Sequence, residues 1–271
     1  AAYGNLTVDT GTTLLLGTTA VTVAGTLENL GVIEKNDTGS IDVSDNNSGI
    51  FRYSTGGGTI PALLGYNNLE VTADTWAAND DLTVNGYLTV NGAAVATFNG
   101  NLAITGALTV SATADASFNA NAGAQATSAG TANLTTTGTV SFGNVVGDSF
   151  TVTGGTLAIS GLPTFALAGT LTASGGITLG KDTGLAAPTT FASTVTVSAD
   201  SIVTTNAHAL AFNANIGCTT NNLETAGTGT VTIADGVALT STNGNLTFGG
   251  AVSLAGAASS ISTTDGAITF S

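Results

Sequence analysis

A six-residue step between short apolar triplets constrains this chain more than any other feature of its sequence. The triplets at 82–84 and 88–90 both read Leu-Thr-Val, and related triplets follow at 102–104 and 108–110. The second pair repeats the first after 20 residues, counted from 82 to 102 and from 88 to 108. The chain therefore carries a short step inside a longer repeat, and the longer spacing is typical of one coil of a repeat protein.

The six-residue step separates two ways of folding this stretch. The Asn-Gly dipeptide at 85–86 has the composition of a two-residue β-hairpin turn. A hairpin there would place Leu88 on the same face as Thr83, opposite to the face of Leu82. An even step preserves the two-residue period of a strand, so a chain that bends without reversing keeps both leucines inward. The step favours a β-solenoid, in which each strand stacks on its equivalent one coil away.

Similar pairs of triplets occur later in the chain. They begin at residues 171 and 177, 231 and 237, and 246 and 252. No window shows a sustained helical apolar pattern with a charged opposite face, and good helix formers other than Ala are scarce. We expect an all-β fold, a single parallel β-helix (β-solenoid) of about 20 residues per coil with little or no α-helix.

Residues 1–81 differ in composition from the rest of the chain. They hold 10 of the 17 acidic residues, together with Lys35, Arg52 and Trp76. We expect 1–81 to form amino-terminal coils with acidic, aromatic-containing insertions, and 82–271 to form a regular β-solenoid. The two parts are expected to make one continuous structural unit.

The charge of the chain argues against several partners. Its formal net charge is −14, only 7% of its residues are charged, and its cations are Lys35, Arg52 and Lys181. A nucleic-acid-binding protein needs a basic footprint to neutralise phosphates, so we expect no nucleic-acid partner. No apolar run of 18 residues occurs, so no membrane insertion is expected. Chains rich in Gly, Ser and Thr can be disordered, but the regular apolar triplets argue for folding.

Three segments of the second half resemble a known group of repeats. They are GNLTFGGAVSLAG at 244–256, ISTTDGAITFS at 261–271 and GTLTASGGITLG at 169–180. They resemble repeat units of filamentous-haemagglutinin-like and other giant secreted bacterial surface proteins, and LTVNGYLTVNGA at 82–93 resembles repeats of other large cell-surface β-helix proteins. The resemblance implies a right-handed parallel β-helix, exported from a bacterium, that acts at the cell surface in adhesion, aggregation or fibre formation. The amino-terminal secretion domain of that family has no recognisable motif here.

An enzymatic function is the alternative to a structural role, and it requires particular catalytic residues. Parallel β-helices include polysaccharide lyases and hydrolases, which need paired carboxylates, or a base together with cations. Asp80 and Asp81 are the one adjacent acidic pair, close in sequence to Trp76, and His208 has no acidic neighbour. We interpret the pair as a solvated turn before a strand, and His208 as a wall or core residue. We therefore expect no catalytic residues and no enzymatic activity, with a carbohydrate-binding or carbohydrate-active β-helix as the alternative.

Metal ligands are scarce in the sequence. Asp42, Asp45, Asn46 and Asn47 place oxygen ligands of the kind that Ca²⁺ prefers in one short stretch. Neither the EF-hand spacing nor the repeat of calcium-binding β-rolls is present, so a solvated acidic loop is the favoured interpretation. One Cys, Cys218, and one His leave zinc without a ligand set, and Cys218 is expected to be a small core or surface residue. We expect no cofactor, with Ca²⁺ as the weak candidate.

Polar residues raise two further possibilities, binding to a regular lattice such as a crystalline glycan and glycosylation of the chain itself. Outward threonines recur in Thr-x-Thr pairs at 151/153, 170/172, 194/196 and 230/232, but their unequal spacing argues against a regular lattice match. Five Asn-x-Ser/Thr sequons would permit glycosylation in a suitable host. The sequons begin at Asn5, Asn36, Asn46, Asn133 and Asn245.

The last residues, 265–271, form another strand triplet, and neither end of the chain shows an amphipathic capping element. An uncapped solenoid end exposes unpaired backbone and an open slice of core. Either the natural chain is longer, or such ends pair head to tail and build a filament. We expect a non-enzymatic, extracellular, cell-surface structural protein, either the subunit of a self-assembling fibre or sheath or the stalk segment of an adhesin. Its candidate partners are further copies of itself and host or cell-surface glycans.

Overall fold

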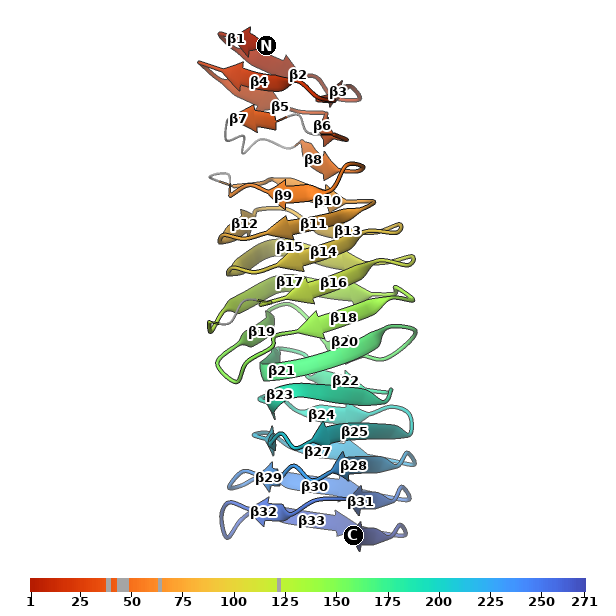
Figure 1. Cartoon of the computed structure of the whole chain (residues 1–271). Helices are drawn as coiled ribbons and strands as arrows, with labels where there is room; N and C mark the ends of the chain where they lie inside the picture. Colours follow the sequence, from red (N-terminus) through yellow and green to blue (C-terminus); the bar gives the residue numbers. More distant parts are fainter. Residues whose placement is uncertain (38–39, 43–48, 63–64, 121–122) are drawn as a thin grey trace. The chain divides into compact units, whose positions relative to one another are not determined.

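The chain forms an all-β solenoid of stacked parallel coils (Figure 1). The computed structural model describes residues 1–37, 40–42, 49–62, 65–120 and 123–271. A coil takes about 21 residues, close to the expected 20, and the chain makes about 12 turns. The described residues contain no helix, so none of them forms a helix long and apolar enough to cross a membrane. The predicted fold class is confirmed.

The strands are short and follow one another closely. Those of the first half are β1 (Ala2–Tyr3), β2 (Leu6–Val8), β3 (Thr13–Leu15), β4 (Ala20–Val23), β5 (Leu27–Asn29), β6 (Val32–Lys35), β7 (Ser40–Asp42), β8 (Ile50–Tyr53), β9 (Gly58–Ile60), β10 (Asn68–Val71), β11 (Thr75–Ala78), β12 (Leu82–Val84), β13 (Leu88–Val90), β14 (Val95–Phe98), β15 (Leu102–Val110), β16 (Asp115–Phe118) and β17 (Ala126–Leu134). Those that follow are β18 (Thr139–Phe142), β19 (Ser149–Val152), β20 (Leu157–Ile159), β21 (Thr164–Ala173), β22 (Ile177–Leu179), β23 (Thr183–Phe191), β24 (Val195–Val197), β25 (Ser201–Asn206), β26 (Leu210–Phe212), β27 (Ile216–Cys218), β28 (Leu223–Gly227), β29 (Val231–Ile233), β30 (Ala238–Ser241), β31 (Leu246–Phe248), β32 (Val252–Leu254), β33 (Ser260–Thr263) and β34 (Ile268–Phe270).

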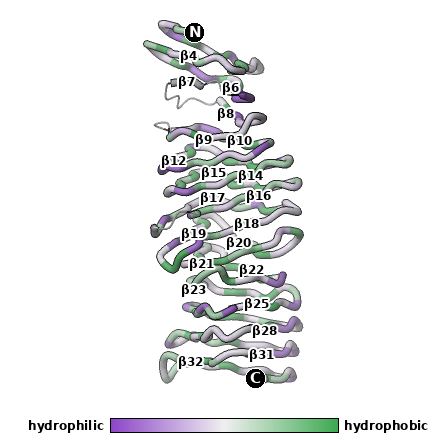
Figure 2. The backbone as a smooth tube through the Cα atoms, in the orientation of Figure 1, coloured by the Kyte–Doolittle hydropathy of each residue, from purple (hydrophilic) through white to green (hydrophobic). Residues whose placement is uncertain are grey.

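The chain divides into two compact units. Unit 1 comprises Ala1–Ala120 and Thr127–Thr139, and unit 2 comprises Asn121–Ala126 and Val140–Ser271. Hydrophobic and hydrophilic segments alternate along the chain in both (Figure 2). Residues that pair at the same position in successive coils are called a rank below. Because a parallel pairing keeps the register, each rank faces either the core or the solvent throughout.

The six-residue step in unit 1 bends the chain without reversing it. Strand β12 pairs with the first half of β15, with Leu82 opposite Leu102, and β13 pairs with the second half, with Leu88 opposite Leu108. Leu82 and Leu88, which begin β12 and β13, are at most 3% exposed, whereas Thr83 faces solvent. The solenoid interpretation of this stretch is confirmed, and the hairpin is excluded.

Gly86 is needed for close approach between coils rather than for a turn. Its N–H donates to the carbonyl of Asn67 at 2.6 Å, and Gly106 of the next coil donates to Gly86 at 2.8 Å. A Cβ at Gly86 would overlap the side chain of Asn68 and the carbonyl of Asn67. The glycine therefore lets three coils stack at the corner that follows β12.

Strands β6, β8 and β10 continue the coil stack through the described residues of 1–81. Ile33, Phe51 and Leu69 form one rank and are at most 4% exposed. Strand β10 in turn pairs with β13, so the acidic and aromatic stretch shares the register of the regular coils of unit 1.

Unit 2 has a core of matched apolar ranks. Strands β20, β22, β24, β27, β30 and β33 form one sheet. Its first inward rank is Leu157, Ile177, Val195, Ile216, Leu239 and Ile261. Aromatic rings also stack between coils, as Phe191 on Phe212 and Phe248 on Phe270, each with centroids 5.4 Å apart. Apolar side chains therefore stack on apolar side chains from coil to coil.

A line of side-chain oxygens links the coils at one corner of unit 2. The Oδ1 atoms of Asp182, Asp200, Asn222 and Asn245 each accept a backbone N–H from the next coil, at 2.7–2.9 Å. The donors are Ile202, Asn222, Asn245 and Ala267. We call this line the Asx ladder. It satisfies backbone donors at a corner where strand pairing is interrupted.

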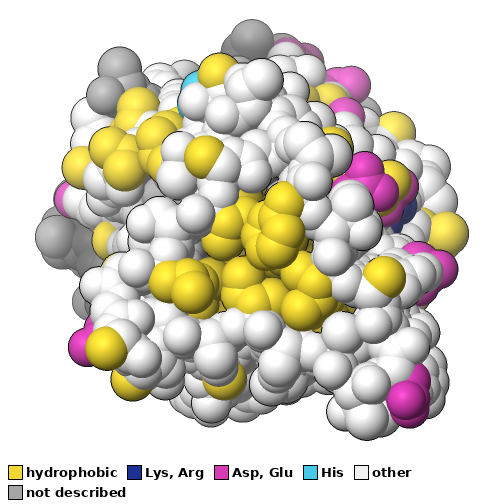
Figure 3. Space-filling view, turned by 90° about the horizontal axis from the view of Figure 1, so that it is seen from below, with side chains coloured by type: hydrophobic (Ala, Val, Ile, Leu, Met, Phe, Trp, Pro, Cys, Tyr) yellow, Lys and Arg dark blue, Asp and Glu magenta, His cyan; other side chains and the backbone are white. Residues whose placement is uncertain are grey.

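The carboxy-terminal coil, formed by β32, β33 and β34, exposes apolar members of ranks that are buried one coil earlier. Phe248 is fully buried but Phe270 is 61% exposed, and Ile233 is fully buried but Leu254 is 49% exposed. Figure 3 shows hydrophobic side chains gathered at the centre of the face seen from below. This coil therefore presents an open slice of core.

The inward register makes a prediction for unit 1. Replacing Leu108, which is fully buried, by Ala should reduce the free energy of unfolding by about 2–5 kcal/mol, because a cavity remains in the rank. Replacing Thr109, the outward neighbour in the same strand, by Ala should change it by less than about 0.5 kcal/mol. Denaturant melts followed by circular dichroism measure both. Equal effects of the two substitutions would contradict the assigned faces.

Candidate functional site

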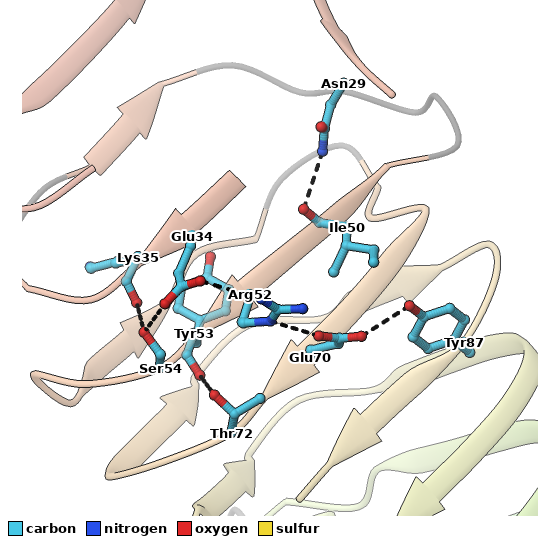
Figure 4. Close-up of polar contacts among 10 residues, drawn as sticks. All are labelled: Asn29, Glu34, Lys35, Ile50, Arg52, Tyr53, Ser54, Glu70, Thr72 and Tyr87. Atoms are coloured by element: carbon cyan, nitrogen blue, oxygen red, sulfur yellow. Dashed lines mark hydrogen bonds and ion pairs between the residues drawn. The ribbon is translucent and has the colours of Figure 1, made fainter. Parts of the chain in front are cut away.

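Arg52, one of the three cations of the chain, lies in unit 1 within a charged rank. Glu34 of β6, Arg52 of β8 and Glu70 of β10 occupy the same position in successive coils. The Arg52 guanidinium bonds to both carboxylates, with Nε 2.8 Å from Glu70 Oε2 and Nη1 3.3 Å from Glu34 Oε2 (Figure 4). The three side chains are 31%, 21% and 16% exposed for Arg52, Glu34 and Glu70, so solvent screens these pairs only in part.

Neutral hydroxyl groups complete the charged rank. Ser54 Oγ donates to Glu34 Oε1 at 2.8 Å, and the Tyr87 hydroxyl donates to Glu70 Oε1 at 3.0 Å (Figure 4). The hydrogen bond that Arg52 donates to Glu70 is the main reason that the pKa of Arg52 is raised. Burial, followed by the negative charge of Glu70, raises the pKa of Tyr87 to about 12. With these hydroxyl groups the rank forms an ion-pair network that links four coils.

Beside the charged rank lies an aromatic cluster inside the core. The hydroxyl groups of Tyr53 and Tyr66 are 2.9 Å apart, and Tyr66 donates to the carbonyl of Pro61 at 2.7 Å. Because Tyr66 uses its proton there, Tyr53 is the donor of the pair. Trp76 packs edge-on against Tyr53 with ring centroids 5.0 Å apart, and is fully buried. Burial raises the pKa of both tyrosines, because it disfavours the phenolate.

Lys35 stands next to this cluster at the edge of a small cavity. Its ammonium lies 5.3 Å from the centre of the Trp76 ring, and burial lowers the pKa of Lys35. The cavity, called the Lys35 cavity below, has a volume of about 40 Å³. It is lined by Leu16, Ile33, Lys35, Ile41, Phe51, Arg52, Tyr53 and Pro61. It combines an apolar lining with one positive group that is not part of the charged rank.

Unit 2 contains an open groove beside the Asx ladder, with a volume of about 330 Å³. It is lined by Asp182, Asp200, Ser201, Ile202, Asn222 and Glu224. The carboxylates of Asp182 and Asp200 already accept backbone N–H groups from the next coil. The groove is therefore the outer surface of a structural ladder.

The acidic pair singled out in the sequence has a structural contact. Asp81 Oδ1 accepts the backbone N–H of Asn101 at 2.8 Å and its side-chain amide at 3.0 Å. These hydrogen bonds lower the pKa of Asp81, and Asp80 is exposed beside it. Trp76 is buried and donates its indole N–H to the carbonyl of Ala73, so its ring offers no platform for a sugar. Asp81 acts here as a cap on the next coil.

The other candidates are dispersed. His208 is half-buried in a turn, where its backbone N–H donates to the carbonyl of Thr205. Cys218 is buried in a rank between Val197 and Ser241, and burial raises the pKa of its thiol to about 11. Among the residues that the structure describes, no group of three or more His, Cys, Asp or Glu side chains is placed to hold a metal ion.

The calcium candidates fall almost entirely outside the described residues. Asp45, Asn46 and Asn47 lie in the stretch 43–48, which the structure does not describe. The backbone of Asp42 belongs to β7 and pairs with Thr22 of β4. The weak Ca²⁺ hypothesis stays a prediction.

Comparison with known proteins gives no relative for this chain: no family model, curated protein or solved structure matches it. The resemblance to secreted surface repeats stays a prediction.

The charged rank was missed in the sequence, although a signal for it exists. Glu34, Arg52 and Glu70 are spaced by 18 residues on each side, close to the length of one coil. Opposite charges at one coil length apart are expected to meet in a solenoid, as they do at i and i+4 in a helix. A search for charge pairs at that spacing would have found the network.

The charged rank predicts a salt-sensitive loss of stability. Replacing Arg52 by Met should lower the free energy of unfolding by about 1–3 kcal/mol, because two partly buried carboxylates lose their partner. Melts at low and high salt should show a smaller loss at high salt. Lys181, whose Nζ donates to the carbonyl of Leu162 on an exposed turn, is the control, and Lys181→Met should change stability by less than about 0.5 kcal/mol. An Arg52→Met protein as stable as the parent would contradict a stabilising role.

The buried tyrosines predict unfolding at alkaline pH. In the unfolded chain Tyr ionises with a pKa near 10, whereas Tyr53 and Tyr66 keep their protons to higher pH in the folded chain. Folding stability should therefore be intact below about pH 10 and fall as the pH rises above it. Tyr53→Phe should make this fall shallower, and Tyr3→Phe, at a position 45% exposed, should leave it unchanged. Denaturant melts over a pH series, with tyrosinate absorbance, measure both effects.

Proposed function

We propose that this chain is a non-enzymatic, extracellular structural protein, the subunit of a self-assembling surface fibre or sheath in which solenoid ends stack head to tail. The observation that carries the proposal is the open apolar coil at β32, β33 and β34. Each of these strands pairs with one earlier strand, β29, β30 or β31 respectively. Their second edges hold backbone groups of the kind that pair between coils elsewhere in the chain.

The amino-terminal coil of a second copy would be the partner surface. Strands β1, β2 and β3 each pair with one later strand, β4, β5 or β6. Leu6 stands in the rank of Leu27, which is 4% exposed, but is itself only half-buried. Two different surfaces that fit each other form a heterologous contact, which propagates into a filament. Stacking would bury Phe270 and Leu6 as the equivalent positions are buried between coils.

Composition supports an exposed, durable structural role. The chain has no Met and one Cys, and that Cys is buried, so few of its side chains are open to oxidation. Parallel coils with matched ranks resemble the stacked arrangement that makes cross-β fibrils persistent. The same features suit the stalk segment of an adhesin, in which the end coils are covered by other parts of a longer chain, with host or cell-surface glycans as targets.

Electron microscopy and sedimentation of the purified 271-residue chain test the proposal. Filaments that grow with protein concentration are expected for the parent chain. Phe270→Asp should abolish them, because a carboxylate would be buried in the contact, whereas Thr269→Asp, at the exposed adjacent position of the same strand, should leave assembly largely intact.

Two results would count against the fibre. Discrete monomers at high protein concentration would leave the adhesin stalk as the structural role. A glycan-array or lyase signal that depends on Asp80 or Asp81 would instead favour the carbohydrate-active alternative.

A further inference from the structure

Lys35 occupies a position in unit 1 that the fold reserves for core residues. It pairs with Tyr53, which pairs with Val71, and Val71 pairs with Val90. Tyr53 is 4% exposed, and the two valines are fully buried. The rank is therefore inward, and a lysine within it places an ammonium where apolar or neutral groups stand in the coils that follow.

The ammonium of Lys35 is not neutralised by the charged rank beside it. The carboxylates of Glu34 and Glu70 are bonded to Arg52, Ser54 and Tyr87. Within the described part of the chain, the Lys35 ammonium lies over the face of the Trp76 ring. A partly buried charge without a counter-ion is costly, which is also why burial lowers the pKa of Lys35.

The Lys35 cavity supplies the second half of a binding site. Its volume of about 40 Å³ is well below that of the ~150 Å³ apolar cavity that admits benzene, so it has room for only a few carbon atoms. Leu16, Ile33 and Phe51 are at most 4% exposed and give it an apolar wall. Arg52 and Tyr53 also reach it, but the first is ion-paired and the second donates to Tyr66.

We propose that the Lys35 cavity binds a short aliphatic carboxylate, with the hydrocarbon tail against Leu16, Ile33 and Phe51 and the carboxylate on the Lys35 ammonium. An anion of this shape supplies a counter-charge that the described residues do not provide and fills the apolar space at once. A neutral aliphatic molecule would leave the ammonium unpaired, and an alkylammonium would place two like charges together. This site is independent of head-to-tail stacking, which uses other surfaces.

The chain contains a built-in reporter for this site. Trp76 is its single tryptophan, and the Lys35 ammonium lies over its ring. A carboxylate that pairs with Lys35 changes the field at the indole, so titration with sodium butyrate should shift Trp76 fluorescence saturably. For so small a ligand the dissociation constant is expected on the order of millimolar. Acetate, which lacks the tail, and butan-1-ol, which lacks the charge, should bind at least about tenfold more weakly.

Lys35→Met keeps the aliphatic stem and removes the charge, and should weaken butyrate binding by about tenfold or more. Lys181→Met, which alters the lysine of unit 2, should bind as the parent does. Ile41→Phe, which narrows the cavity at its lining, should weaken butyrate binding while leaving the charge in place.

Butyrate binding and protonation of Lys35 should be thermodynamically coupled, and a lysine with a purely structural role would not show this coupling. Bound butyrate should raise the pKa of Lys35, measured by NMR of its side-chain nitrogen, and binding should weaken as the pH rises above that pKa. No saturable fluorescence change with butyrate, an equal response to butan-1-ol, or unchanged affinity in Lys35→Met would each overturn the proposal.

Discussion

Parallel backbone pairing between successive coils is the constraint on which the rest of this structure depends. The pairing joins a strand to its equivalent about 21 residues later, so a residue can change partners only if a whole coil shifts. A shift by one residue would turn every inward side chain outward, which the apolar ranks forbid. The leucines of β12, β13 and β15 hold this register in unit 1, and the isoleucines and valines of the sheet beginning at β20 hold it in unit 2.

The same register decides where chemistry can occur. In the inward rank that begins at Leu157, apolar residues stack on apolar residues, and the wall there is chemically uniform. The ranks through β6, β8 and β10 are different, because they mix acidic, basic, aromatic and aliphatic residues. Arg52 forms ion pairs with the carboxylates of the coil before it and the coil after it. The hydroxyl groups of Tyr53 and Tyr66 are hydrogen-bonded to each other. Lys35 lies at an inward position beside a cavity, and among the described residues its ammonium faces the Trp76 ring rather than a carboxylate.

Much of the fold could be predicted from the sequence, because parity is a local property that leaves a visible pattern. The step from Leu82 to Leu88 and the repeat at Leu102 were enough to predict parallel coils and their inward faces. The role of Gly86 was not visible, since its tight contact is with residues of neighbouring coils. The candidate site was harder still. The pairing of Glu34, Arg52 and Glu70 depends on a coil of 18 residues, shorter than the average coil, and the Lys35 cavity depends on side chains from several coils.

The Asx ladder gives the solenoid a direction of growth. Asp182, Asp200, Asn222 and Asn245 each present an acceptor on the earlier coil that is filled by an N–H of the later one. A finished coil thus already displays the group that orients its successor, and nothing from the far end of the unit is required. Winding in this part of the chain can follow the order of synthesis, coil by coil, with each completed turn acting as the template for the next.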